Sequence, residues 1–119
     1  RLDRGEALVA RVLRPFSDRP TVTFERLDLG GHGIRELTWI PPLGAYLVIG
    51  GPVDRAPGFS LWCWTPGAAA RRIPLPAFDR LCRPEAILPV PGRREVILLS
   101  EEGGAFCADP PYTYLRLGF

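Results

Sequence analysis

The sequence predicts an all-β protein made of propeller-type, four-stranded antiparallel blades, with about two and a half blades in 119 residues. Fourteen Pro and thirteen Gly residues are spread along the chain and leave little room for long helices. Short runs rich in Val, Ile, Leu and aromatic residues lie between these breakers, which is the pattern of strands. Strand pairs also recur at a period of roughly 50 residues, which is typical of propeller blades.

Six segments are the clearest predicted strands: Ala7–Leu13, Thr21–Leu29, Tyr46–Ile49, Phe59–Thr65, Glu95–Ser100 and Tyr112–Leu117. Within the fourth of them, Phe59, Leu61 and Cys63 share one face, and Ser60, Trp62 and Trp64 share the other. Both faces are apolar, so we expect this strand to be covered on both sides by stacked sheets.

The internal repeat defines the expected strand order. The first two strands of a blade occur twice, as Ile34–Pro41 with Tyr46–Gly51 and as Arg83–Pro91 with Val96–Gly103. In this alignment Glu36 corresponds to Glu85. The third strand begins at Gly5, Gly58 and Gly104, and the fourth covers Thr23–Leu29, Arg71–Leu75 and Tyr112–Leu117.

The predicted organisation is therefore a single all-β unit over 1–119. Residues 1–29 supply the third and fourth strands of a first blade, 30–76 a second blade, and 77–119 a third. Propellers usually contain four to eight blades, so this number leaves a ring incomplete. We expect upstream blades of a longer chain, or other copies of this chain, to complete it. A small β-sandwich of two stacked sheets is the alternative fold.

Two sequence motifs resemble those of a known family. The stretch Leu27–Leu37 (LDLGGHGIREL), followed by YLVIGGP and one blade later by Arg83–Ile87 (RPEAI), resembles a bacterial β-propeller family known only as a domain of unknown function. The similarity covers about Ala10–Gly103 and corresponds to the C-terminal part of that family's domain. It implies a propeller fold and no agreed activity. Related propellers include phytases and lactonases, an analogy of fold alone.

Charge and cysteine content limit the partners and the cellular compartment expected for the protein. Fifteen Arg residues, with no Lys, face thirteen acidic residues, so neither nucleic acid nor an acidic membrane is an expected partner. The all-Arg composition indicates a GC-rich, bacterial genome. No apolar run is long enough to span a membrane, and no leader segment is visible.

Cys63, Cys82 and Cys107 form no zinc motif, and we interpret them as reduced residues of a cytoplasmic protein. One disulfide with one free thiol is the alternative.

The candidate ligand-binding residues lie in and before the two predicted first strands: His32, Arg35, Glu36, Arg83 and Glu85. Inner strands of neighbouring blades converge on a central channel, so the carboxylates of Glu36 and Glu85 are placed to face one another. Carboxylates with carbonyl oxygens suit Ca²⁺, and paired carboxylates also suit acid–base catalysis. The alternative is that each glutamate pairs with a nearby Arg, or with backbone N–H groups, as a structural device. No metal ligand is assigned.

Two other features have a structural and a functional interpretation. The glycine-rich turn around His32 lacks the following helix of a phosphate loop, and its glycines are expected to supply positive φ angles. His32 has no nucleophile and acid grouped near it in the sequence, so an exposed loop position is expected. Trp39, Trp62 and Trp64 are expected to fill the space between blades, with an aromatic binding wall as the alternative.

The function favoured by these patterns is a non-enzymatic binding or assembly module, because no nucleophile–base set or cofactor motif is evident. The alternative is a metal-dependent, phosphoesterase- or lactonase-like hydrolase with Glu36 and Glu85 at the channel. A protein partner is compatible with the first interpretation.

Overall fold

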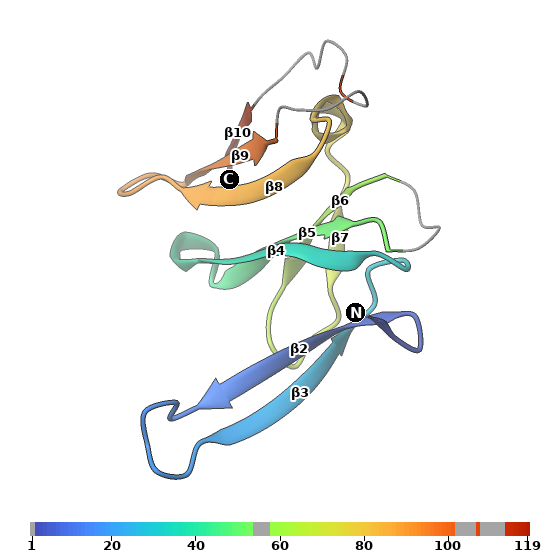
Figure 1. The fold of residues 1–119 in the computed structure, drawn as a ribbon. Helices are drawn as coiled ribbons and strands as arrows, with labels where there is room; N and C mark the ends of the chain where they lie inside the picture. The colour runs from blue at the N-terminus through green and yellow to red at the C-terminus, as the bar shows by residue number, and fades with distance from the viewer. Residues whose placement is uncertain (1, 54–57, 102–106, 108–113) are drawn as a thin grey trace.

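A computed structural model describes residues 2–53, 58–101, 107 and 114–119 and confirms the all-β class. The described residues form three antiparallel sheets, none of which closes on itself in this part of the chain. The sheets are stacked one above another, with β2–β3 at one end and β8–β10 at the other (Figure 1). The strands that coincide with the six clearest predicted segments match them to within two residues: β2, β3, β5, β6, β9 and β10.

The first sheet is built around one hairpin. Strands β2 (Glu6–Leu13) and β3 (Thr21–Leu27) pair in a register that places Ala7 opposite Leu27. A short strand, β1 (Leu2–Asp3), adds to β2 through a tight turn. The two central residues of that turn, Arg4 and Gly5, both have positive φ, which gives the backbone a twist that suits a two-residue hairpin.

The second sheet has four strands in chain order: β4 (Gly33–Ile40), β5 (Ala45–Gly51), β6 (Ser60–Trp64) and β7 (Arg71–Ile73). A 3₁₀ turn, η1 (Pro41–Leu43), connects the first two of them and ends at Gly44, which has φ of 60°. Left-handed backbone of this kind carries almost no strain at glycine. The sheet is therefore a complete up-and-down meander.

The third sheet contains β8 (Pro84–Pro89), β9 (Glu95–Ser100) and β10 (Tyr114–Gly118) after a second 3₁₀ segment, η2 (Pro76–Arg80). Strand β10 pairs directly with β9. The sequence placed this segment fourth, so its predicted position was wrong: it lies third. The strand expected to begin at Gly104 falls outside the described residues, apart from Cys107.

Two apolar clusters lie between the three sheets. Between the second and third sheets, Leu47, Ile49 and Leu61 pack near Val96 and Leu98. Between the first and second sheets the cluster consists of Ala7, Leu27, Leu29, Val48 and Trp64. Strand β6 contributes Leu61 to one cluster and Trp64 to the other, so the expectation that both faces of this strand are covered is confirmed.

The cysteine interpretation needs correction. Cys82 and Cys107 form a disulfide with Cα atoms 5.7 Å apart, and Cys63 is the free thiol. The alternative of one bridge with one free thiol is therefore the one the structure has. Because disulfides persist mainly in oxidising compartments, the argument for a cytoplasmic protein from reduced thiols no longer holds.

Candidate functional site

The candidate residues gather at one end of the second and third sheets. Strand β4 begins there and β5 ends there, since Gly33 lies opposite Gly51 in their register. The third sheet repeats this arrangement with Pro84 opposite Ser100. This end therefore collects the start of each first strand and the connection that precedes it.

His32 is held in place by a hydroxyl that the sequence did not connect with it. Its Nδ1 lies 2.7 Å from the Ser60 Oγ, and the Trp62 Nε1–H donates to the same oxygen at 2.7 Å. The indole can only donate, so the Ser60 oxygen accepts from Trp62, and the same hydroxyl either donates to Nδ1 or accepts from it according to the His32 tautomer. Ser60 is only 3% exposed. A hydroxyl covered to this extent is an anchor for His32 and is not open to a substrate.

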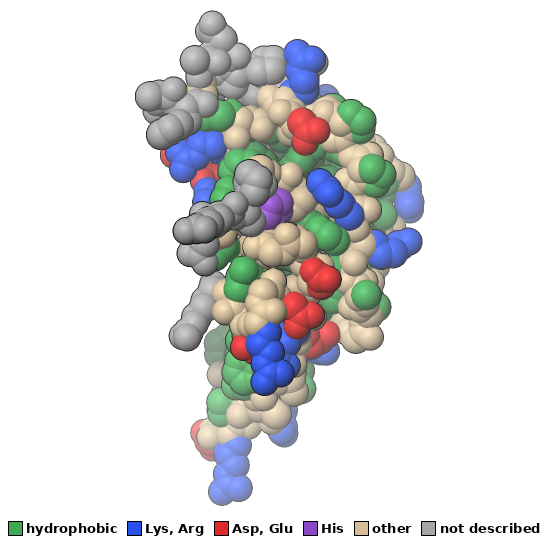
Figure 2. Space-filling view, turned by 90° about the vertical axis from the view of Figure 1, so that its right-hand side faces the viewer, with side chains coloured by type: hydrophobic (Ala, Val, Ile, Leu, Met, Phe, Trp, Pro, Cys, Tyr) green, Lys and Arg blue, Asp and Glu red, His purple; other side chains and the backbone are tan. Residues whose placement is uncertain are grey.

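Close backbone approach makes this cluster possible. A Cβ on Gly50 would lie 2.6 Å from the Ser60 Oγ and 3.1 Å from the His32 Cβ. A side chain here would displace the Ser60 hydroxyl, because real Cβ atoms essentially never show a contact of 2.6 Å, and it would also press on the His32 Cβ. The turn before β4 is shaped similarly: Gly30 and Gly31 have φ of 64° and 83°, as expected from the sequence. Figure 2 shows the histidine side chain partly exposed on a face over which Arg and acidic side chains are scattered.

Arg35 and Glu85 form an ion pair that joins β4 to β8. Each residue sits at a register shift, between Ile34 and Glu36 in one strand and between Pro84 and Ala86 in the other. The two shifts are β-bulges, which re-aim the side chain of the extra residue. Arg35 also lies over the Phe59 ring, with its Cζ 5.9 Å from the centroid.

The register changes the repeat alignment. Arg35, and not Glu36, takes the position in β4 that Glu85 takes in β8. Glu36 has a different partner, since its Oε1 accepts from the Thr38 hydroxyl at 2.5 Å. The two glutamates that the sequence paired thus have separate partners. The structural alternative for Glu85, a pairing with an arginine, is the arrangement present.

Arg83 lies at the same end but in a separate interaction. Its Nη1 is 3.4 Å from the Glu101 Oε2, and its backbone N–H donates to the Ser100 hydroxyl at 2.9 Å. Of the five candidates, the structure therefore joins Arg35 to Glu85. It leaves His32, Glu36 and Arg83 each with other partners.

No group of three or more His, Cys, Asp or Glu side chains close enough to hold a metal ion occurs among the residues that the structure describes. The Ca²⁺ site remains a prediction from the sequence.

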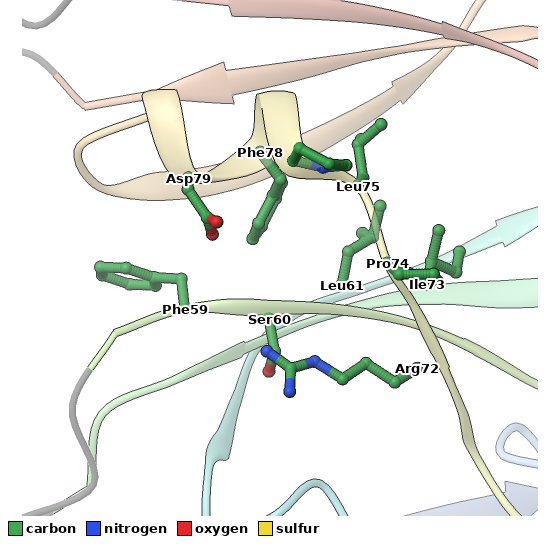
Figure 3. A pocket seen from close by; sticks show the side chains of 10 residues that line it. Phe59, Ser60, Leu61, Arg72, Ile73, Pro74, Leu75, Phe78 and Asp79 are labelled. Carbon is green, nitrogen blue, oxygen red and sulfur yellow. The ribbon is translucent and has the colours of Figure 1, made fainter.

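A cavity of about 310 Å³ opens beside this end, between β6–β7 and η2. Its walls include Phe59, Leu61, Ile73 and Phe78, and Asp79 stands at its rim (Figure 3). The Asp79 carboxylate points toward the space between the two phenyl rings, whereas the Arg72 guanidinium lies on the other side of the β6 ribbon. The cavity thus has both apolar and polar side chains in its lining, Ser60 and Arg72 among the latter, and one acidic group at its opening.

The residues that sequence reasoning missed are Ser60, Phe59 and Asp79. Ser60 is 28 residues from His32, and the pairing of β5 with β6 brings them together. No spacing in the sequence signals that contact. The two adjacent glycines, Gly50 and Gly51, were the available hint, because glycines within a strand often mark a close approach of other groups.

Comparison with known proteins adds no relative: no family model, no curated protein and no solved structure matches the chain. None of the helices in the described part of the chain has the length and apolarity that crossing a membrane requires.

Proposed function

We propose that this chain is a propeller-type binding or assembly module. Its stacked sheets continue into further sheets, supplied by other copies of the chain or by upstream blades of a longer one. The observation that carries the proposal is an apolar sheet face at each end of the stack that no other part of the described chain covers. The four-stranded meander β4–β7 and the bulge repeated in β4 and β8 support the propeller-type arrangement.

The first uncovered face lies on the third sheet and can be compared with its equivalent. Taking Arg35 and Glu85 as equivalent, Leu47 and Ile49 of β5 correspond to Ile97 and Leu99 of β9. Leu47 and Ile49 are 1% and 0% exposed because the third sheet covers them. Leu99 is 36% exposed, and its neighbours Leu88 and Tyr114 on the same face are also exposed. The same strand positions are thus fully buried in one sheet, whereas in the next Ile97 is partly buried and Leu99 is exposed.

The second uncovered face lies on the hairpin β2–β3. Leu8, Val12, Val22 and Phe24 point away from the second sheet, and Phe24 is 63% exposed. Both faces are apolar and lie at opposite ends of one stack (Figure 1). Exposed apolar patches of this kind mark interaction surfaces in soluble proteins. Two different faces at opposite ends favour head-to-tail association, which closes into a ring when the rotation permits.

Size-exclusion chromatography with light scattering tests the proposal directly. We expect masses that are multiples of 13.2 kDa. Phe24→Asp disables one face and Leu99→Asp the other, so each variant alone should be monomeric. An equimolar mixture should restore a dimer, because each variant keeps the face that the other lacks.

The control variant is Phe16→Asp, at a fully exposed position in the turn between β2 and β3, which should associate like the parent chain. A parent chain that is a stable 13.2 kDa monomer at high concentration would overturn assembly between copies. A mixture of Phe24→Asp and Leu99→Asp that stays monomeric while the parent associates would overturn the head-to-tail arrangement.

A further inference from the structure

Three aromatic side chains form a continuous row across the second sheet. Trp39 of β4 is opposite Tyr46 of β5, which is opposite Trp64 of β6. The Trp39 and Tyr46 ring centroids are 5.0 Å apart in an edge-to-face arrangement, and those of Tyr46 and Trp64 are 5.4 Å apart. Trp64 is buried, whereas Trp39 remains 44% exposed. The row therefore runs from the core out to the surface.

This row is one wall of a cleft of about 700 Å³. The opposite wall is β2, where Val9 and Arg11 lie two residues apart on the face toward the second sheet. Figure 1 shows the β2–β3 hairpin extending away from the second sheet toward its turn. The cleft therefore lies between two sheets of a single chain and does not depend on the assembly proposed above.

Polar groups in the cleft are few, and three of them have no partner. The Trp64 Nε1–H donates to the Ala68 carbonyl at 3.1 Å. Within the described residues, neither the Trp39 Nε1–H nor the Tyr46 hydroxyl has a hydrogen-bond partner, and Arg11 has no ion pair. The cleft thus combines aromatic faces, two hydrogen-bond donors and one exposed cation.

We propose that this cleft binds a proline-rich segment in the polyproline II conformation that carries an acidic residue. Such a helix has three residues per turn and no internal hydrogen bonds, so its carbonyls remain free to accept from Trp39 and Tyr46. One turn rises about 9 Å, so a single turn can reach both Trp39 and Tyr46, whose ring centroids are 5.0 Å apart. Aromatic-lined grooves bind this preformed conformation at low entropic cost. Arg11 on the opposite wall selects the acidic residue.

A sugar chain is the main competing ligand, since sugars also stack on aromatic rings. A sugar ring carries hydroxyl groups on all sides, and these need several polar partners. Apart from the aromatic row and Arg11, the side chains lining this cleft are mostly apolar: Val9, Ala10, Leu37 and Pro66, with Thr65 as the exception. The lining therefore favours the peptide.

Tryptophan fluorescence titration tests the proposal with an acetylated, amidated peptide that has a central glutamate between two runs of four prolines. We expect saturable binding with a change in tryptophan emission, weakened about tenfold or more by Trp39→Ala, as for an aromatic anchor. Arg11→Gln should weaken binding about two- to fivefold at low salt, the range of an exposed ion pair. The parent chain should likewise bind a peptide with lysine in place of glutamate about two- to fivefold more weakly than the glutamate peptide.

The matched controls are Phe16→Ala and Arg19→Gln, an exposed aromatic and an exposed arginine in the β2–β3 turn, which should bind like the parent. A peptide in which glycine and serine replace the prolines should not bind. The proposal is overturned if no saturable binding occurs with the proline peptide, or if Trp39→Ala binds it unchanged. Binding of a glucose-based oligosaccharide that requires Trp39, without peptide binding, would assign the cleft to sugars instead.

Discussion

Loss of the Cys82–Cys107 disulfide should lower the free energy of unfolding by about 3.5 kcal/mol at 25 °C. The bridge joins residues 25 apart in sequence, and the chain-entropy relation for a loop of that length gives this value. The loop contains β8 and β9, which place Val96 and Leu98 in the core. Total stability for domains is typically about 5–15 kcal/mol, so this loss is a large share of it.

Urea denaturation of the Cys82→Ser/Cys107→Ser double variant, followed by circular dichroism, measures the loss. Cys63→Ala is the control, since its sulfur is in no bridge and only one thiol is removed. Thiol titration of the unfolded, unreduced chain should give one thiol, and three after reduction. Three thiols before reduction would refute the bridge. A stability difference below about 1 kcal/mol would refute the entropic argument instead.

Two further predictions concern the candidate site. Gly50→Ala should destabilise the protein by about 1–3 kcal/mol in the same urea assay, because its Cβ would meet the Ser60 Oγ at 2.6 Å. Gly118→Ala, whose Cβ would meet only an ordinary contact at 3.8 Å, is the control and should cost less. Arg35→Glu and Glu85→Arg should each destabilise by about 1 kcal/mol or less, the range for exposed pairs, and the double reversal should recover most of the loss. A double reversal no more stable than either single variant would contradict the pairing.

The strand positions could be predicted because the local pattern and the packing agree. In β6, apolar residues on both faces predicted a covered strand, and Leu61 and Trp64 do pack into two separate clusters. Strand β10 was also located correctly in the sequence. Its neighbour was not, because pairing with β9 depends on the path of the intervening chain and not on the alternation within either strand.

The candidate site was less predictable, because its contacts are long-range. The Arg35–Glu85 pair joins residues 50 apart, and the Cys82–Cys107 bridge spans 25 residues. Cysteine spacing could exclude a zinc motif, but it carried no information about which sulfurs meet. Likewise, aligning Glu36 with Glu85 matched identical residues and missed the bulges, which shift the equivalence by one residue to Arg35.

The opposite charges at the two bulges bear on how the sheets choose their neighbours. Arg35 and Glu85 occupy equivalent positions, so the second sheet presents a cation where the third presents an anion. Two copies of either sheet placed side by side in the same geometry would bring like charges together, which is unfavourable. The apolar faces of β5 and β9 are similar in character and discriminate poorly between neighbours. Burial of apolar side chains holds the stack together, and the ion pair specifies which sheet lies next to which. A half-exposed pair of modest strength is sufficient for that purpose.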